Sequence, residues 1–377
     1  MRYFIIAGEA SGDLHASNLI NELKEADKKA DFQFLGGDLM ATAAGKAPVI
    51  HYRDMAFMGF INVALNLRTV LGNMKRCKEA LAAYKPDVLI LIDYPSFNLD
   101  IAKFAKKTMA GMPVYYYISP KIWAWKTWRV KAIKKLIDRM YTILPFETEF
   151  YKQYGYEVEY VGNPSVDAVA RHMWTESEET KALDTKRTVA LLAGSRKQEI
   201  RMCLPRMLEV AERFTDYDFV VAGAPGVEES FYKEVIGKKH ATVVFGHTYD
   251  LLEKSRAAIV NSGTATLETA LLRVPEVVVY NLTGGRLVNI AQKLVIKVKW
   301  VSLVNLIANR EVVPELIAAD FTVEKTAVAL AKILQETAER KKMLEGMDEV
   351  IEKLGAPGAA KKAARAMVRD LEEKNKQ

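Results

Sequence analysis

Carboxylates and small residues directly follow two apolar runs in the first third of the chain. Gly8-Glu9-Ala10-Ser11-Gly12-Asp13 follows the run 3–7, and Asp93 ends the run 88–92. Small residues let the backbone approach a ligand closely, and partial desolvation raises the pKa of a carboxyl group into the range of a general base. The loop matches neither the dinucleotide fingerprint nor the Walker loop. The structural alternatives are a plain strand-to-helix turn at 8–13 and a helix-capping role for Asp93.

Two loops in the second half of the chain contain residue types that bind phosphate. Gly194-Ser195-Arg196 opens a predicted helix, where free N–H groups and a guanidinium would hold an anion. Ser262-Gly263-Thr264 would surround a second phosphate, and Glu268, one helical turn beyond, could accept hydrogen bonds from ribose hydroxyls. Two such loops are more specific than one, although two ordinary helix starts stay the alternative.

Tryptophans and basic residues are concentrated after the run 114–118. Three tryptophans between residues 123 and 128 are interleaved with lysines, and from Ala102 to Arg139 the only acidic residue is Asp138. Aromatic faces stack on sugar rings or lie at a lipid interface, while cations hold phosphates. RNA binding would use similar residues. The alternatives are core packing for the tryptophans and a solvated helix face for the cations.

No metal and no cofactor is expected. Asp216-Tyr217-Asp218 has the D-x-D pattern of some metal-binding transferases, but it precedes a predicted strand and therefore lies at the wrong end of the sheet. The 5 histidines lack metal-ligand spacing. His247 follows the run 243–245, where it would lie near a nucleotide base or serve as an ordinary loop histidine.

Short β-type runs alternate with helical patterns along most of the chain, which predicts an α/β protein with two doubly wound, Rossmann-like domains. The predicted strands are Tyr3–Ala7, Phe32–Leu35, Val88–Ile92, Val114–Ile118, Tyr141–Leu144, Val158–Val161, Val189–Leu192, Phe219–Ala222, Val243–Phe245, Ala258–Val260 and Val277–Tyr280. We expect one domain over 1–170, a second over 186–350, and a C-terminal helix over 351–377 that could pack on the first. Because ligands lie beyond the carboxyl ends of parallel strands, the two domains are expected to face a central cleft.

The composition is that of a globular protein, with 50% hydrophobic and 27% charged residues, a net charge of +7 and a pI near 9.0. Two cysteines, Cys77 and Cys203, favour a reducing cytoplasm over a disulfide framework. The N-terminus is too short for a signal-peptide core, and no uncharged run reaches the ~18 residues of a membrane span. Export and membrane spanning are therefore disfavoured.

An apolar segment over 55–68, followed by the basic residues Lys75, Arg76 and Lys78, is typical of an interfacial helix with flanking cations. We expect the region 55–78 to face a membrane, and a buried helix with a basic end is the alternative. The predicted membrane-facing residues are Met58, Phe60, Ile61, Leu65 and Leu67.

From about Tyr3 to Leu316 the chain resembles the lipid-A-disaccharide synthase family, which consists of inverting glycosyltransferases of the GT-B fold. The resemblance rests on ordered motifs across both predicted domains. They are residues 8–13, Met58-Gly59-Phe60, Asp93 with Pro95, Phe97 and Asn98, Ser119-Pro120 with Trp123-Ala124-Trp125, Leu144-Pro145-Phe146-Glu147, Gly194-Ser195-Arg196, Ser262-Gly263-Thr264-Ala265 with Leu267-Glu268, and Val301-Ser302-Leu303 with Asn305.

The resemblance implies a reaction between two acylated sugars. The donor would be UDP-2,3-diacylglucosamine, the acceptor 2,3-diacylglucosamine 1-phosphate, and the products a β-1,6-linked disaccharide 1-phosphate and UDP. The protein would work in the cytoplasm, peripherally associated with the inner membrane.

The resemblance also implies roles for particular residues. Asp93 is the candidate general base, and Glu9 would lie close to the reacting sugars. The predicted UDP-sugar site consists of Gly194, Ser195, Arg196, Ser262, Gly263, Thr264, Glu268, Asn305 and Arg310. The predicted acceptor side of the cleft consists of Ser11, Gly12, Asn98 and Ser119.

Three positions depart from the pattern of the family. Ser96 replaces a second Asp, and Ala193 and Val304 each replace a Pro. Ser96 removes a carboxylate, so the role of base falls more heavily on Asp93.

Other functions remain open at the level of the sequence. A transferase for an undecaprenyl-linked sugar or a UDP-sugar 2-epimerase would use the same phosphate loops. The apolar region near Met58 favours a lipid acceptor over a soluble epimerase. A UDP-sugar-binding protein without catalysis would not need Glu9 and Asp93, and a nucleic-acid-binding protein would leave both phosphate loops without a role.

Overall fold

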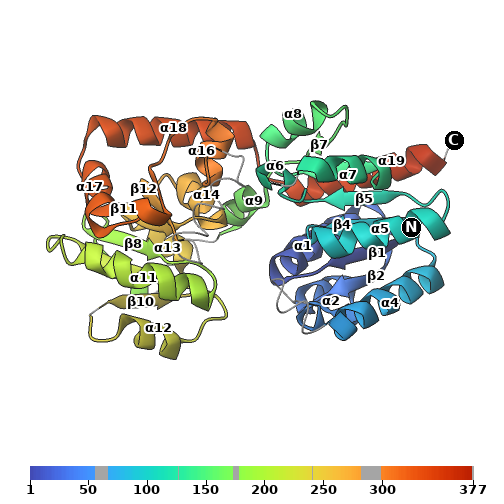
Figure 1. Ribbon diagram of the computed structural model, residues 1–377, viewed down its shortest axis with the longest axis horizontal. Helices are drawn as coiled ribbons and strands as arrows, with labels where there is room; N and C mark the ends of the chain where they lie inside the picture. The colour runs from blue at the N-terminus through green and yellow to red at the C-terminus, as the bar shows by residue number, and fades with distance from the viewer. Residues whose placement is uncertain (56–66, 126, 173–177, 240, 282–298, 376–377) are drawn as a thin grey trace. The chain divides into compact units, whose positions relative to one another are not determined.

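The computed structural model describes residues 1–55, 67–125, 127–172, 178–239, 241–281 and 299–375. The chain divides into two compact units (Figure 1). The first unit is Met1–Pro164 together with Ala356–Gln377, and the second is Ser165–Gly355. The first division thus lies before residue 170, where we expected the first domain to end, and the last helix groups with the first unit.

The first unit contains a parallel sheet of seven strands in the order β3-β2-β1-β4-β5-β6-β7. Its strands are β1 (Arg2–Ala7), β2 (Asp31–Gly36), β3 (Ile50–His51), β4 (Val88–Ile92), β5 (Val114–Tyr117), β6 (Arg139–Thr142) and β7 (Glu159–Tyr160). Its helices are α1 (Ala10–Ala26), α2 (Asp38–Ala44), α4 (Leu67–Tyr84), α5 (Pro95–Thr108), α6 (Ile122–Trp125), α7 (Val130–Leu136), α8 (Phe146–Lys152) and α19 (Ala359–Asn375), with 3-10 turns η1 (Tyr52–Asp54) and η2 (Thr127–Arg129).

Helices cover both faces of this sheet, which explains why its central strands are apolar throughout. In β4, Ile90 packs with α1, whereas Leu89 and Leu91 pack on the opposite face with α4, α5 and α7. The last helix, α19, packs beside α1 and contributes Met367 and Leu371 to the same core (Figure 1). The first polar residue after such a strand therefore marks the position where the strand ends.

The second unit contains a parallel sheet of six strands in the order β10-β9-β8-β11-β12-β13. Its strands are β8 (Thr188–Leu192), β9 (Asp218–Gly223), β10 (Thr242–Phe245), β11 (Ala257–Asn261), β12 (Glu276–Tyr280) and β13 (Glu315–Ile317). Its helices are α9 (Pro164–Arg171), α10 (Glu178–Lys181), α11 (Lys197–Ala211), α12 (Glu229–Ile236), α13 (Thr248–Glu253), α14 (Thr264–Leu271), α16 (Leu303–Ala308), α17 (Val323–Leu334) and α18 (Ala338–Leu354), with η3 (Ala318–Asp320).

Each sheet has one point where the strand order reverses. In the first sheet the chain moves outward from β1 to β2 and β3 and then returns to β4 beside β1. In the second sheet it moves from β8 to β9 and β10 and returns to β11 beside β8. Right-handed crossovers then place successive helices on opposite faces, which opens a crevice at the carboxyl ends of the two central strands. A ligand site is expected at each reversal.

The structure confirms the predicted α/β class and all eleven predicted strands, with shifts of one or two residues at most ends. Two strands were missed, β3 and β13, because two or three residues are too few to produce an alternating pattern. Helix α1 begins at Ala10, so that Ser11, Gly12 and Asp13 form its first turn. No helix of the described residues is long and apolar enough to cross a membrane.

Candidate active site

The turn after β4 holds Asp93 at the strand reversal of the first sheet. Asp93 and Tyr94 both have positive φ angles, 41° and 48°, which cost non-glycine residues about 1–3 kcal/mol each. The Nδ2 amide of Asn98 donates to the carbonyls of Ile92, at 3.2 Å, and Asp93, at 2.6 Å. The Tyr116 hydroxyl also donates to the Asp93 carbonyl. These contacts maintain a strained backbone that presents the Asp93 carboxylate.

Gly8 is required at the neighbouring end of β1 because the ring of Tyr94 packs on it. A Cβ at Gly8 would lie 2.3 Å from Cγ of Tyr94. The Tyr94 hydroxyl donates to the carbonyl of Met55 at 3.0 Å, so the ring has little freedom to move away. The two loops that we identified from the sequence, at 8–13 and at Asp93, are therefore in direct contact.

The environment of Asp93 raises its pKa to about 6, chiefly through burial and further through the negative charge of Glu9. The positive charge of Lys121 and a hydrogen bond from the Tyr94 amide oppose the rise. A carboxyl group with such a pKa is largely ionised near pH 7 and still accepts a proton readily, which suits a general base. The structure therefore brings Glu9, Asp93 and Lys121 together.

The remaining residues of the first loop are divided between surface and core. Glu9 is half-buried at the N-cap of α1, and the exposed Ser11 donates from Oγ to its Oε1 at 3.2 Å. Gly12 packs against β1, where a Cβ would lie 3.2 Å from that of Ala7. Asp13 is buried and accepts from the Gly37 amide at 2.7 Å, so that it caps α2 and not its own helix.

Like Gly12, the predicted acceptor-side residues Asn98 and Ser119 are buried, and their side chains bond to neighbouring residues. Asn98 is inaccessible and holds the Asp93 turn, as described above. Ser119 is also buried, and its Oγ lies 2.8 Å from the Tyr151 hydroxyl.

Sequence reasoning gave no site role to Glu147, although burial raises its pKa to about 7. Its carboxylate accepts from the Leu144 amide at 3.0 Å, and its position three residues beyond Leu144 is the sequence signal for such a contact.

The first phosphate-type loop of the second unit lies at the end of β8. Gly194 has a φ of 121°, and a Cβ there would lie 2.6 Å from Oε2 of Glu199. The Ser195 amide donates to Oε2 of Glu199 at 3.0 Å, and Nη1 of Arg196 donates to Oε1 at 2.8 Å. Glu199, the third residue of α11, thus places a carboxylate where the loop would hold an anion.

The second phosphate-type loop lies at the end of β11, beside the first. Gly263 and Thr264 are exposed at the start of α14, and Ser262 Oγ donates to the carbonyl of Val301 at 3.4 Å. Burial raises the pKa of Glu268, and a hydrogen bond from the Tyr249 hydroxyl opposes the rise. The strand order places both loops at one reversal, and Tyr249 is a neighbour that the sequence did not reveal.

Asn305 has a different position from the one we predicted. It is buried in α16, where Nδ2 donates to the Val313 carbonyl at 2.8 Å and to Oε1 of Glu315 at 2.9 Å. Its Oδ1 accepts from the amides of Val312, at 2.7 Å, and Val313, at 3.0 Å. The amide is saturated, so Asn305 fixes the loop before β13 and has no hydrogen-bonding capacity left for UDP.

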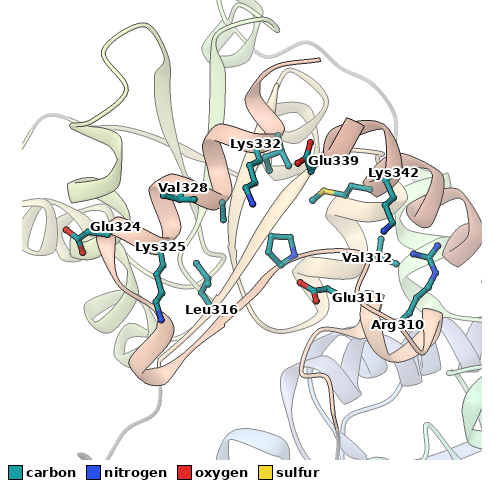
Figure 2. Close-up of a pocket in the computed structure, with 14 residues that line it drawn as sticks. Arg310, Glu311, Val312, Leu316, Glu324, Lys325, Val328, Lys332, Glu339 and Lys342 are labelled. Atoms are coloured by element: carbon teal, nitrogen blue, oxygen red, sulfur yellow. The ribbon is translucent and has the colours of Figure 1, made fainter. Parts of the chain in front are cut away.

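Arg310 also lies away from the predicted UDP loops. It follows α16 and precedes β13, at the amino ends of the strands, and its guanidinium pairs with Glu349 of α18. Figure 2 shows Arg310 and Lys342 at one end of a groove and Glu324 and Lys325 at the other. The groove has a volume of about 540 Å³ and follows the edge strand β13 between α17 and α18, and neither phosphate loop contributes to its lining.

His247 is bonded within the second unit. Its Nδ1 lies 2.9 Å from Oδ2 of the buried Asp250, whose Oδ1 lies 2.9 Å from Nε2 of His172. Among the described residues no group of three or more His, Cys, Asp or Glu side chains is arranged to hold a metal ion. The predicted membrane residues Met58, Phe60, Ile61 and Leu65 lie outside the described residues, and for Leu67 only its backbone, at the start of α4, is described.

Comparisons of the whole sequence agree with this geometry. The profile of the family described as lipid-A-disaccharide synthetase matches residues 3–368. The lipid-A-disaccharide synthase of Syntrophus aciditrophicus (strain SB) is 40% identical over 371 residues, which cover 96% of this chain and 95% of the relative. That of Myxococcus xanthus (strain DK1622) is 39% identical over 375 residues, 97% of each chain.

The chain belongs to the lipid-A-disaccharide synthase family. It is therefore a hexosyltransferase of lipid A biosynthesis, as the sequence motifs predicted.

Solved structures that resemble this family member are far less similar in sequence. The UDP-GlcNAc 2-epimerase of Neisseria meningitidis bound to UDP-GlcNAc has a TM-score of 0.64 at 13% identity, covering 99% of this chain and 100% of its own. A glycotransferase of kitacinnamycin has a TM-score of 0.63 at 13% identity, with coverage of 98% and 99%. These likenesses show the GT-B-type fold alone, and the family match disfavours the alternative of an epimerase.

Proposed function

We propose that the acceptor's 6-hydroxyl is activated by Asp93 of the first unit. The acceptor would be 2,3-diacylglucosamine 1-phosphate and the donor UDP-2,3-diacylglucosamine, as in the reaction that the family resemblance implies. The observation that carries the proposal is the carboxylate of Asp93 at the strand reversal, with its pKa raised to about 6 beside Glu9. As the hydroxyl attacks the anomeric carbon from the face opposite UDP, Asp93 removes its proton.

Exchange of Asp93 for Asn tests this role. We expect turnover to fall by ~10²-fold or more while the affinity for UDP changes little, because the base acts on the acceptor and not on the nucleotide. Asp100→Asn removes an exposed carboxylate from α5, the helix that follows Asp93, and serves as the matched control. UDP release and disaccharide formation are measured together. Near-normal turnover in Asp93→Asn would exclude it as the base, and UDP release without disaccharide would indicate hydrolysis.

The second part of the proposal concerns UDP. The starts of α11 and α14 offer N–H donors at one strand reversal, and Arg196 supplies a charge that stabilises UDP as the glycosidic bond breaks. Glu199 now accepts from the Ser195 amide and from Arg196, so the diphosphate would take over both donors from this carboxylate. Glu268 and Ser262 are proposed contacts of the ribose and of the phosphates.

Calorimetric titration of UDP into Arg196→Ala tests the nucleotide site. Loss of a charge-assisted contact, about 1.5–3 kcal/mol, should weaken UDP binding by about 10- to 100-fold. Arg201→Ala is the control, since Arg201 lies on the same helix and pairs with Glu234 at 2.7 Å. Equal weakening of UDP binding by both substitutions would show that the effect comes from the overall charge of the protein and not from a contact between Arg196 and UDP.

We also propose peripheral association with the inner face of the cytoplasmic membrane. Acylated substrates require it, and the predicted docking segment over 55–78 continues into α4, where Leu71 is 59% exposed near Lys75 and Arg76. Leu71→Glu should reduce flotation with vesicles of anionic phospholipid. Leu39→Glu, at a leucine of α2 that is 48% exposed, should not. Unchanged flotation of Leu71→Glu would argue against docking through α4.

A further inference from the structure

Arg129 carries a positive charge without a carboxylate partner among the described residues. It ends η2 and is half-buried, and its Nη2 lies 3.5 Å from Oγ of Ser96, which is at the limit of a hydrogen bond. Its Cζ lies 5.5 Å from the ring centre of Trp128. A guanidinium in this position is expected to have an anionic ligand.

The position of Arg129 is set by the same turn that holds Asp93. Ser96 lies in the first turn of α5, three residues beyond Asp93. Burial raises the pKa of the Tyr116 hydroxyl well above its ordinary value, and the charge of Arg129 opposes that rise. That hydroxyl donates to the carbonyl of Asp93. Arg129 therefore lies near the Asp93 turn without pairing with its carboxylate.

The chemistry of the proposed acceptor fits a guanidinium that lies near the Asp93 turn without pairing with the Asp93 carboxylate. In a hexose 1-phosphate, the 6-hydroxymethyl group and the anomeric phosphate are attached to the two carbons that flank the ring oxygen. An acceptor whose 6-hydroxyl meets Asp93 therefore carries its phosphate within one sugar ring of the base. A guanidinium binds a phosphomonoester with two parallel hydrogen bonds, which also fixes the orientation of the sugar.

We propose that Arg129 binds the anomeric phosphate of the acceptor and thereby selects a phosphorylated sugar. The inference rests on the proposed acceptor, a glycosyl acceptor with a 1-phosphate. The exposed ring of Trp128 keeps the guanidinium in place through a cation–π contact.

The test compares two acceptors, 2,3-diacylglucosamine 1-phosphate and the same sugar without phosphate, with the full-length protein and the UDP donor. Loss of one charge-assisted contact in Arg129→Gln should lower kcat/KM for the phosphorylated acceptor by about 10- to 100-fold, mainly through KM. The value for the unphosphorylated acceptor should stay unchanged. Lys107→Gln removes an exposed charge on α5, about 16 Å along the helix from Ser96, and should change neither kcat/KM value.

A second variant covers the case that Arg129→Gln does not fold. Arg129→Lys keeps the positive charge but loses the two parallel donors of the guanidinium. It should lower kcat/KM for the phosphorylated acceptor, by less than Arg129→Gln does, and leave the value for the unphosphorylated acceptor unchanged.

The outcomes separate this inference from the proposed function. An active wild type whose Arg129→Gln and Arg129→Lys variants lose activity equally with both acceptors would overturn the inference alone. If Arg129→Gln lost binding to anionic vesicles but kept the preference for the phosphorylated acceptor, the inference would also be overturned, because Arg129 would then bind a lipid headgroup. A wild type inactive with both acceptors would overturn the proposed function and this inference with it.

Discussion

Exchange of Asp93 for Asn should stabilise the folded protein near neutral pH although it removes the proposed base. The carboxyl group has its pKa raised from 3.8 to about 6 in the folded chain, chiefly by burial. The folded state therefore holds the proton more tightly than the unfolded state. The penalty for ionising the group is absent below the unfolded pKa, grows as the pH rises, and is fully present above the folded pKa. Asn carries no such penalty at any pH.

The size of the effect follows from the two pKa values. At about 1.36 kcal/mol for each pKa unit, the full penalty is at most about 3 kcal/mol. About 2 kcal/mol of it develops between about pH 4.5 and pH 8. Asp93 is partly exposed, so solvent screening reduces the effect, and we expect Asp93→Asn to gain about 1–2 kcal/mol on the wild type across this range.

Urea unfolding of the wild type and Asp93→Asn at several pH values measures this gain. Asp100→Asn, at an exposed position of α5, the helix that follows Asp93, should change the free energy of unfolding by less than ~0.5 kcal/mol throughout. A stability difference for Asp93→Asn that does not vary with pH would refute the reasoning. So would a variant that is less stable than the wild type at pH 8.

Three further substitutions probe the same turn. Glu9→Gln removes a charge that raises the pKa of Asp93, so the acidic limb of the pH profile of kcat/KM should move to lower pH, and an upward shift would contradict the electrostatic account. Asn98→Ala removes a donor from the Ile92 carbonyl and leaves the Asp93 carbonyl with the Tyr116 hydroxyl. It should cost about 1–3 kcal/mol in urea unfolding, against a result below ~0.5 kcal/mol if water replaces the amide. Gly8→Ala places a Cβ 2.3 Å from the Tyr94 ring and should displace the Asp93 turn, which would reduce turnover at least about tenfold. The affinity for UDP, measured by calorimetry, should be preserved. Weakened UDP binding would show that the damage extends beyond this turn.

Much of the fold could be read from the sequence because its central strands are buried on both faces. Val88–Ile92 contains five consecutive apolar residues, and the structure begins and ends β4 at these same positions. The edge strands β3 and β13 have no such pattern, since one side of each is unpaired and Glu315 begins β13. Their existence depends on pairing with β2 and β12, which are distant in sequence.

The residues that follow strands were identified by the same logic, but their roles were not all visible. Asn98 was expected beside the acceptor, and it supports the Asp93 turn from inside the core. Asn305 was expected to contact UDP, and its amide is consumed by the loop before β13. An asparagine that completes a buried loop and one that binds a ligand cannot be told apart in the sequence. Only the donors and acceptors that surround the side-chain amide in the structure distinguish them.

The sequence by itself determined the α/β class, the family and the positions where polar residues leave the strands, because hydrophobic periodicity and local motifs are properties of neighbouring residues. The tertiary structure decided which of those residues meet. The pKa of Asp93 depends on burial and on Glu9, which is 84 positions away in the chain, and Arg129 contacts Ser96, which is 33 positions away. Desolvation and Coulomb interactions act through space, so that they follow from the folded arrangement and not from spacing along the chain.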